Sequence, residues 1–136
     1  RSMALMWEER ERFPAWAREA IARHVPPSFR LEAVPRARLL AERTSWVLKS
    51  DYGCEGAEVI VGASVSRGEW AEALGRARPE RFIVQRRFDP ILDESGASTN
   101  HGVYLVAGVA SGLFCRVQRG PTDRRARTVA ALVDGP

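Results

Sequence analysis

The sequence predicts an α+β fold in which helices flank a mixed or antiparallel sheet. Segments with helical spacing of apolar residues are interspersed with short runs rich in aromatic and β-branched residues. Two such runs, 102–106 and 111–117, are separated by a short segment that contains Gly108, as in an antiparallel hairpin. The chain has 136 residues, of which 45% are hydrophobic and 28% charged, so it can bury the core of one domain.

Four segments are expected to be helical. Residues 4–12 are typical of a polar helical arm, and a second helix has Pro14 in its first turn and ends at residues 25–27, Val-Pro-Pro. A third helix covers residues 35–43 and has a proline at its start. The fourth begins at Ser66, which forms a capping box with the glutamate three residues later.

The remaining apolar segments are expected to form strands, with turns and polar loops between them. The predicted strands are 45–49, 58–61, 81–88, 102–106 and 111–117, and 128–133 is either a strand or a short helix. Residues 89–101 are rich in Ser, Thr, Asn and Gly and are expected to form a polar loop. The tryptophans stand at periodic positions and are expected to lie in the core: Trp7, Trp16, Trp46 and Trp70.

Composition and charge exclude several classes of protein. No apolar run is long enough to span a membrane, so no membrane partner is expected. The two cysteines, Cys54 and Cys115, are too few for a disulfide scaffold, so a cytoplasmic protein is expected. Of the 21 basic residues only Lys49 is a lysine, and the net charge is +4. Arginine serves where a positive surface charge suffices, which singles out this one compact ammonium.

Lys49 ends a predicted strand and precedes a loop with two glycines, Gly53 and Gly56. Glycines let the backbone approach a ligand closely and point several N–H groups at one anion, and a lysine adds a full positive charge. These are the groups that bind a polyphosphate. The pattern alone is equally compatible with a tight hairpin that has a lysine at its edge.

The order of elements is a strand with a lysine, a glycine loop, a strand, a helix and a further strand. This order resembles the nucleotide-binding subdomain of the ATP-grasp superfamily, and more narrowly its circularly permuted, glutathionylspermidine synthase-like group. Lys49 matches the family's lysine, with Ser50 in place of a proline. Residues 53–57, Gly-Cys-Glu-Gly-Ala, match its glycine loop, and residues 84–85, Val-Gln, match the end of its next strand. With the following hairpin, the resemblance covers roughly residues 35–133.

The resemblance implies a role for each matched residue. Lys49 would contact the α- or β-phosphate of ATP, the loop amides would close over the β- and γ-phosphates, and adenine would lie against a hinge. The loop residues are Tyr52, Gly53, Cys54, Glu55, Gly56 and Ala57, and the hinge residues are Ile83, Val84 and Gln85. ATP and Mg²⁺ are the implied cofactors, and the resemblance assigns neither a catalytic residue nor a metal ligand to this chain.

In this superfamily a carboxylate attacks the γ-phosphate of ATP, and an amine then displaces phosphate from the acyl phosphate. The resemblance implies that residues 35–136 form the ATP-binding lobe of such a carboxylate–amine ligase, preceded by an N-terminal helical segment, 1–34. Only a few dozen residues precede the lobe. The chain is therefore expected to be either part of a larger enzyme that further lobes, in the same or another chain, complete, or a degenerate lobe that stands alone.

A non-catalytic basic module that binds nucleic acid or an acidic protein is the alternative. It is based on the arginines between residues 119 and 127. A nucleic-acid module would interleave such a patch with exposed aromatic residues, which this segment lacks, so nucleic acid is not the expected partner. His24 and His101 lack the spacing of metal ligands and are expected to be a helix-end packing residue and a loop residue.

Overall fold

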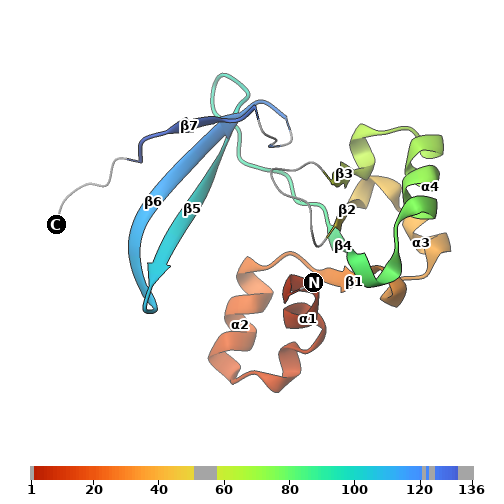
Figure 1. The fold of residues 1–136 in the computed structure, drawn as a ribbon, viewed down its shortest axis with the longest axis horizontal. Coiled ribbons are helices and arrows are strands. Elements are labelled where there is room, and N and C mark those ends of the chain that lie inside the picture. The colour runs from red at the N-terminus through yellow and green to blue at the C-terminus, as the bar shows by residue number, and fades with distance from the viewer. Residues whose placement is uncertain (1, 51–57, 121, 123–124, 132–136) are drawn as a thin grey trace. The chain divides into compact units, whose positions relative to one another are not determined.

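The computed structural model describes residues 2–50, 58–120, 122 and 125–131, and the chain divides into two compact units. Residues 2–50 and 58–88 belong to the first unit, and residues 89–131 to the second (Figure 1). The first unit contains helices and a sheet, and all strands described in both units pair antiparallel. The α+β class is therefore confirmed, with antiparallel rather than mixed sheets.

The first unit contains four α-helices and four strands among its described residues. In chain order they are α1 (Ser2–Glu8), α2 (Ala15–His24), β1 (Ser28–Arg30), α3 (Arg36–Ala41), β2 (Trp46–Ser50), β3 (Val59–Val61), α4 (Arg67–Arg76) and β4 (Phe82–Arg86). Single turns of 3₁₀ helix lie between them, at Arg10–Arg12, Leu31–Ala33, Arg43–Ser45, Gly62–Ser64 and Pro79–Arg81. All four expected helices are present with ends shifted by a few residues, and Ser66 forms the predicted capping box. None of the helices in the described residues is both long and apolar enough to cross a membrane.

The four strands of this unit form a sheet in the order β1-β4-β2-β3. β4 thus lies between β1 and β2, although it is the last strand of the unit in sequence. In the register of the sheet, Gln85 of β4 stands opposite Ser28 on one side and Val47 on the other. Because β1 precedes residue 35, the N-terminal segment supplies an edge strand to the sheet that contains Lys49.

One face of this sheet carries the hydrophobic core. Trp46, Leu48 and Val84 project from β2 and β4. They pack with Leu39 of α3 and Trp70 of α4, and all five side chains are buried. The Trp70 indole N–H donates to the Leu39 carbonyl at 2.9 Å, which satisfies the one polar atom of a fully buried ring and joins α3 to α4. The predicted core positions of Trp46 and Trp70 are confirmed.

The opposite face of the sheet is more polar. Side chains alternate between the faces along a strand, so the neighbours of the core residues project away from the core. By register this second face carries Ser28, Val47, Lys49, Ile83 and Gln85. Hydrophobic and polar side chains therefore share one surface, on which the single lysine of the chain lies.

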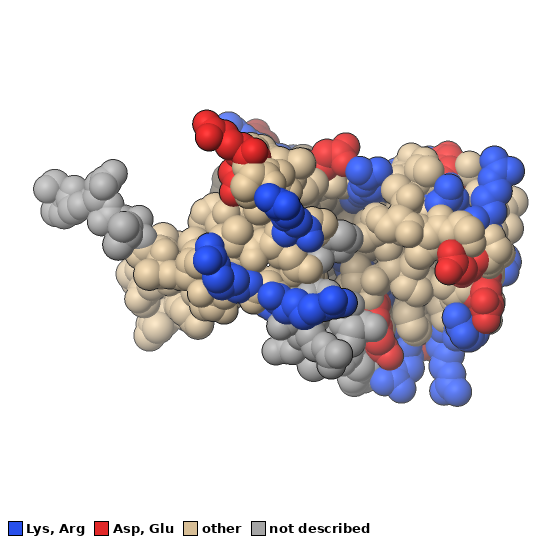
Figure 2. All heavy atoms as spheres, turned by 90° about the horizontal axis from the view of Figure 1, so that it is seen from above, with Lys and Arg blue, Asp and Glu red and all other residues tan. Residues whose placement is uncertain are grey.

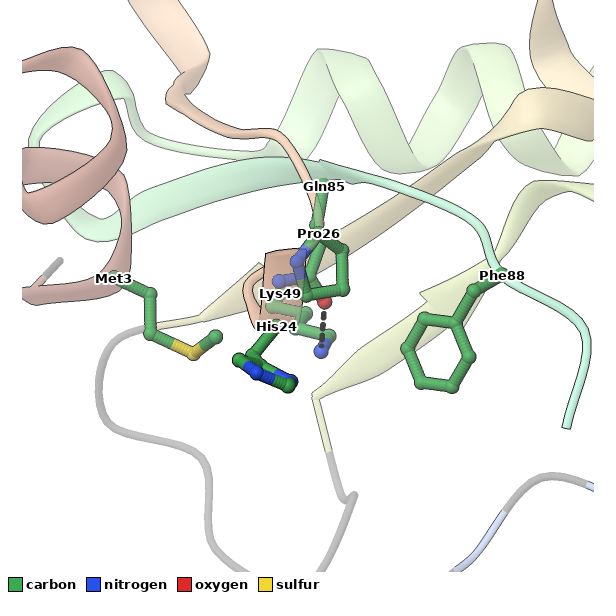
Figure 3. A pocket seen from close by; sticks show the side chains of 6 residues that line it. All are labelled: Met3, His24, Pro26, Lys49, Gln85 and Phe88. Atoms are coloured by element: carbon green, nitrogen blue, oxygen red, sulfur yellow. Dashed lines mark hydrogen bonds between the residues drawn. The ribbon is translucent and has the colours of Figure 1, made fainter. Parts of the chain in front are cut away.

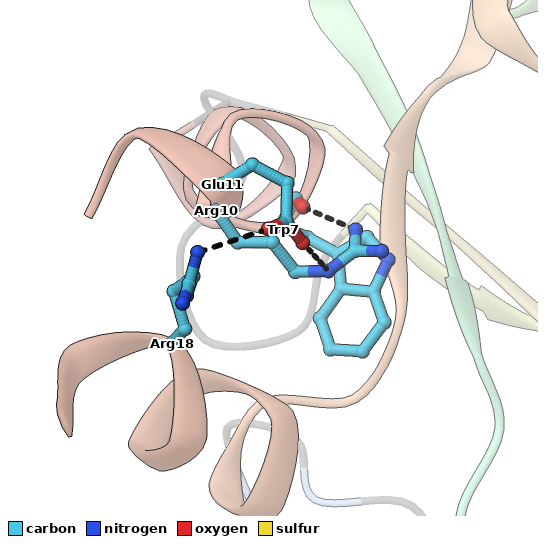
Figure 4. A network of polar contacts seen from close by, with 4 residues as sticks. All are labelled: Trp7, Arg10, Glu11 and Arg18. Atoms are coloured by element: carbon cyan, nitrogen blue, oxygen red, sulfur yellow. Dashed lines mark hydrogen bonds and ion pairs between the residues drawn. The ribbon is translucent and has the colours of Figure 1, made fainter. Parts of the chain in front are cut away.

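Ion pairs hold the two N-terminal helices to the sheet and to each other. The Glu8 carboxylate, at the end of α1, accepts hydrogen bonds from the backbone N–H of Arg30 at 2.9 Å and from its guanidinium at 2.6 Å. Glu11 accepts from Arg18 of α2 at 3.3 Å and pairs with Arg10 at 3.7 Å (Figure 4). The Glu11 pairs are exposed and individually weak. The more buried Glu8–Arg30 pair is therefore the one that sets where α1 meets β1.

The expectation that all four tryptophans lie in the core is wrong for Trp16, which is 74% exposed. Ile21 is the only described residue that α2 buries, and a position five residues earlier points to a different side of a helix. Helical spacing in the sequence was therefore a poor guide to how much of this short helix is covered. Trp7 is half-buried.

The second unit contains a three-stranded antiparallel sheet in the order β5-β6-β7. Its strands are β5 (Ser98–Val106), β6 (Val109–Gln118) and β7 (Arg127–Val129). Ala107 and Gly108 join β5 to β6 with φ angles of 50° and 81°, as a type I′ hairpin turn requires. The hairpin is confirmed, but β5 begins within the segment expected to be a polar loop, since pairing with β6 outweighs the polar composition of residues 98–101. The last predicted segment is a strand, β7.

Replacing Gly62 with alanine is expected to destabilise the first unit by about 3 kcal/mol. A Cβ at this position would lie 2.1 Å from the backbone carbonyl oxygen of Arg43, which cannot move aside independently. The Arg43 guanidinium also donates to the carbonyls of Gly62 and Val65, so the two turns are bound together.

The control is Gly75→Ala in α4, where a Cβ would meet only the end of the Arg36 side chain at 3.8 Å. This change should stabilise the helix by about 0.5–1 kcal/mol. Urea unfolding followed by tryptophan fluorescence measures both variants. Equal unfolding free energies for the two would contradict the close approach at Gly62.

Candidate functional site

Lys49 is the fourth residue of β2 and lies on the face opposite the core. Its ammonium donates a hydrogen bond to Oε1 of Gln85 on β4, at 2.6 Å. The register places Ile83 directly opposite Lys49 and Gln85 on the diagonal, a separation that two long side chains can span. A specific partner therefore holds the lysine that the sequence singled out.

The hydrogen bonds continue beyond Gln85. Its Nε2 donates to Oγ of Ser28 at 2.7 Å, and the Ser28 hydroxyl donates to the carbonyl of Pro26 at 2.8 Å. Gln85 is 2% exposed and Ser28 is 0% exposed, so their polar atoms depend on these partners rather than on water. Groups from β2, β4, β1 and the residues just before β1 thus form one connected polar network.

The Lys49 ammonium lies in a pocket of about 390 Å³ within the first unit. The pocket is lined by Met3, His24, Pro26, Lys49, Gln85 and Phe88. Figure 3 shows the rings of His24 and Phe88 on either side of the Lys49–Gln85 hydrogen bond, with Met3 beyond His24. The pocket therefore combines one ammonium and one amide with walls that are mostly apolar or aromatic.

A second hollow of about 270 Å³ shares His24, Pro26 and Phe88 with the first. It adds the basic residues Arg23, Arg86 and Arg87. Arg86 is already engaged, because its guanidinium pairs with Glu42 at 2.8 Å and lies 4.0 Å from the centre of the Trp46 ring. The surroundings of the Lys49 pocket are nevertheless positively charged, which favours an anionic ligand.

Desolvation is the main influence on the charge of the Lys49 side chain. Burial lowers the pKa of Lys49, because desolvation disfavours the charged ammonium. No ion pair between described residues involves this side chain. An ammonium has three N–H donors, and one of them is used on Gln85. A partly desolvated cation with unused donors gains from a ligand that brings negative charge.

The structure brings together two of the residues that the resemblance assigns to the ATP site, Lys49 and Gln85. Ile83 is buried on the same face of the sheet, whereas Val84 projects into the core on the other face. Of these three strand residues only Gln85 lines the pocket. The backbone of β4 at 83–85 pairs with β1 on one side and β2 on the other. The predicted loop residues Tyr52, Gly53, Cys54, Glu55, Gly56 and Ala57 lie outside the described residues.

Sequence reasoning missed Met3, Pro26 and Phe88 of this pocket and Ser28 of the polar network beside it. It assigned His24 to helix-end packing, whereas the structure places this residue in the lining of both hollows. Ser28 is separated from Gln85 by 57 positions, and β1 spans only three residues, too few to show the alternation that marks a strand. No local signal in the sequence could have joined these residues to Lys49.

Metal ligands are sparse in the part of the chain that the structure describes, where no three His, Cys, Asp or Glu side chains are placed to hold an ion. A Mg²⁺ ion that arrives with a nucleotide takes ligands largely from phosphate oxygens and water, so it needs few protein carboxylates. The described residues are compatible with a metal carried by the ligand and do not form a separate metal centre.

Comparison with models of protein families, with curated proteins and with solved structures finds no match to this chain. The function is therefore inferred from the chemistry of the Lys49 pocket together with the resemblance in the sequence. Both point to a ligand that carries negative charge.

Replacing Lys49 with methionine is expected to remove a rise in stability that the wild type shows at alkaline pH. The folded state lowers the pKa of Lys49, so the unfolded chain binds this proton more tightly. Wild-type stability should therefore rise as the pH increases from the lowered pKa towards the ordinary lysine value. Methionine removes both the desolvation penalty and this rise.

Urea unfolding at pH 7 and at alkaline pH gives the unfolding free energy of both proteins. The difference between the wild type and Lys49→Met isolates the contribution of Lys49, because all other titratable groups are the same in the two proteins. Lys49 is the only lysine in the chain, so no second ammonium contributes to the difference. A difference in unfolding free energy between the two proteins that stays constant from pH 7 to alkaline pH would contradict the lowered pKa of Lys49.

Proposed function

We propose that this chain contains the ATP-binding lobe of an ATP-grasp carboxylate–amine ligase, which other lobes in the same or another chain complete. The observation that carries the proposal is the position of the Lys49 ammonium. It lies in the pocket and donates one of its three N–H groups to Gln85. The proposal includes Mg²⁺ bound together with ATP and a cytoplasmic location.

The floor of the pocket suits a ligand that accepts hydrogen bonds. Both ends of the Gln85 amide are used, its oxygen by Lys49 and its nitrogen by Ser28. Lys49 uses one of its three N–H groups on Gln85 among the described residues, and an ammonium N–H pairs well with phosphate oxygens. The pocket has a volume of about 390 Å³ and is open to solvent.

The walls suit a flat ring. Met3 and Phe88 are large hydrophobic side chains that are 40% and 63% exposed, and they line the same pocket as the imidazole of His24. Aromatic and apolar faces are favourable surfaces for a nucleobase. A ligand with an aromatic ring and an anionic tail, such as a nucleoside triphosphate, matches both the walls and the floor.

The order of elements also supports the proposal. β2 with Lys49 is followed by the glycine-containing segment, β3, α4 and β4, and β2 pairs antiparallel with both β3 and β4. This is the succession of strand, loop, strand, helix and strand on which the resemblance to the ATP-grasp nucleotide lobe is based.

In the proposed reaction, a substrate carboxylate oxygen attacks the γ-phosphorus of ATP, and ADP leaves. The nitrogen of an amine then attacks the acyl carbon, inorganic phosphate leaves, and the amine loses a proton. Lys49 would hold the phosphate chain and neutralise part of its charge, which is how phosphoryl transfer is mostly catalysed. The groups that bind the acid and the amine would come from the other lobes.

The alternative, a basic module for nucleic acid or an acidic protein, depends on arginines that are free to bind. Several arginines outside the segment 119–127 are paired with glutamates in the same chain: Arg12, Arg18, Arg30, Arg38, Arg76 and Arg86. On the face seen in Figure 2, basic side chains are interspersed with acidic ones over much of the surface. A module of that kind would lose affinity steeply with salt and would be indifferent to Lys49.

Millimolar MgATP is expected to raise the melting temperature of the wild-type protein and to leave that of Lys49→Met unchanged. At a nucleotide concentration ten times the dissociation constant, binding adds about 1.4 kcal/mol to stability. Trp16→Ala is the matched control, because Trp16 is exposed and does not line the pocket. An equal shift in the wild type and Lys49→Met, or no shift in either, would count against the proposal.

Phe88→Ala is expected to weaken ATP binding about tenfold, since base–aromatic stacking contributes roughly 1–3 kcal/mol. The same change should leave the affinity for inorganic triphosphate unaltered, because that ligand has no ring. Isothermal titration of both ligands separates the two contributions. If Phe88→Ala weakened triphosphate as much as ATP, Phe88 would not contact the base.

A further inference from the structure

We propose that Gln85 and Ser28 are positioning residues for Lys49: Gln85 holds the ammonium in place, and Ser28 fixes which end of the Gln85 amide faces it. The inference rests on the proposed function, because the ligand that Lys49 receives is taken to be a triphosphate. It goes beyond the resemblance, which assigns Gln85 to an adenine hinge and includes no residue before position 35.

The direction of each hydrogen bond follows from the one before it. The Ser28 hydroxyl has a single proton and donates it to the carbonyl of Pro26, so its free lone pairs can only accept. The Gln85 NH₂ group supplies that donor at 2.7 Å, which turns the amide oxygen towards Lys49 at 2.6 Å. A flipped amide would place its N–H groups against the ammonium and its oxygen against the Ser28 oxygen, whose single proton is already donated to Pro26.

Burial makes this arrangement hard to replace. Ser28 and Gln85 are almost completely removed from water, so solvent cannot satisfy their polar atoms if a partner is lost. Gln85 also belongs to the strand with neighbours on both sides, β1 and β2. Its backbone is therefore fixed by two ladders, and the hydrogen bonds of its side chain to described residues go to Ser28 and Lys49.

The arrangement gives Lys49 a fixed direction without neutralising it. A free lysine samples many rotamers and loses that freedom when it binds a ligand, whereas an ammonium already anchored has less to lose. Because an amide carries no net charge, the full positive charge stays available to an anion. A carboxylate at the position of Gln85 would hold the ammonium equally well and cancel its charge, so glutamine suits an anion site and glutamate does not.

The test compares three variants by isothermal titration with inorganic triphosphate and with ATP. Gln85→Glu is expected to weaken triphosphate binding at least tenfold, because the ion pair neutralises Lys49, and its circular dichroism spectrum checks that the variant is folded. Ser28→Ala frees the amide to flip and should weaken binding about fivefold. Ser111→Ala is the control, since this exposed hydroxyl bonds only the Val109 carbonyl among the described contacts.

A purely structural role for Gln85 predicts the opposite for Gln85→Glu, namely that a better-held lysine binds triphosphate as well as before. Wild-type affinity in both Gln85→Glu and Ser28→Ala would overturn the inference and leave the proposed function standing. Absence of triphosphate and ATP binding in the wild type would overturn the proposed function, and the inference with it.

A measurement on the wild type covers the case in which a variant fails to fold. Because Lys49 is the only lysine, labelling with ¹⁵N-lysine gives a single side-chain ammonium signal. A hydrogen-bonded ammonium exchanges its protons slowly enough to be seen in an NMR spectrum near neutral pH and low temperature, with cross-relaxation to the Gln85 amide. An ammonium signal lost to exchange, as for a lysine in free solution, would overturn the positioning role.

Discussion

The hydrogen bond from Lys49 to Gln85 depends on β4 lying between β1 and β2. From that central strand, Gln85 reaches Lys49 on one side and Ser28 on the other. The same register sends Leu48 and Val84 to the opposite face, into the core. A slip by one residue would exchange the two faces and place the lysine among the tryptophans. The core and the polar network therefore depend on the same strand order and register.

The two faces of the sheet make opposite contributions to the stability of the first unit. Burying part of an ammonium is unfavourable, and no ion pair between described residues offsets it at Lys49. Trp46 and Trp70 are fully buried on the other face, where apolar burial stabilises the unit. Binding sites commonly cost a protein some stability, because groups that are unfavourably buried in the free protein become favourable once a ligand pairs with them. Apolar burial on the core face offsets the free-energy cost of the partly buried ammonium on the other face.

The N-terminal helices are part of the site rather than a separate arm. Met3 of α1 and His24 of α2 line the pocket that contains Lys49. The Glu8–Arg30 ion pair attaches α1 to the edge strand β1, which also carries Ser28. One short edge strand thus links the helical wall of the pocket to the polar network at its floor. This arrangement lies before the region that the sequence resemblance covers.

Local chemistry in the sequence determined the antiparallel hairpin, the helix starts at proline and at Ser66, and the single lysine at the end of a strand. These features depend on neighbours a few residues apart, which a linear pattern records. Trp16 shows the limit of such patterns, because helical spacing does not reveal which side of a helix is covered. Only the tertiary structure decided that Gln85 holds Lys49, 36 positions away, and that Ser28 orients Gln85, 57 positions away. The physical reason is that strand order and register follow from burial of the whole sheet, and no stretch of local sequence contains that information.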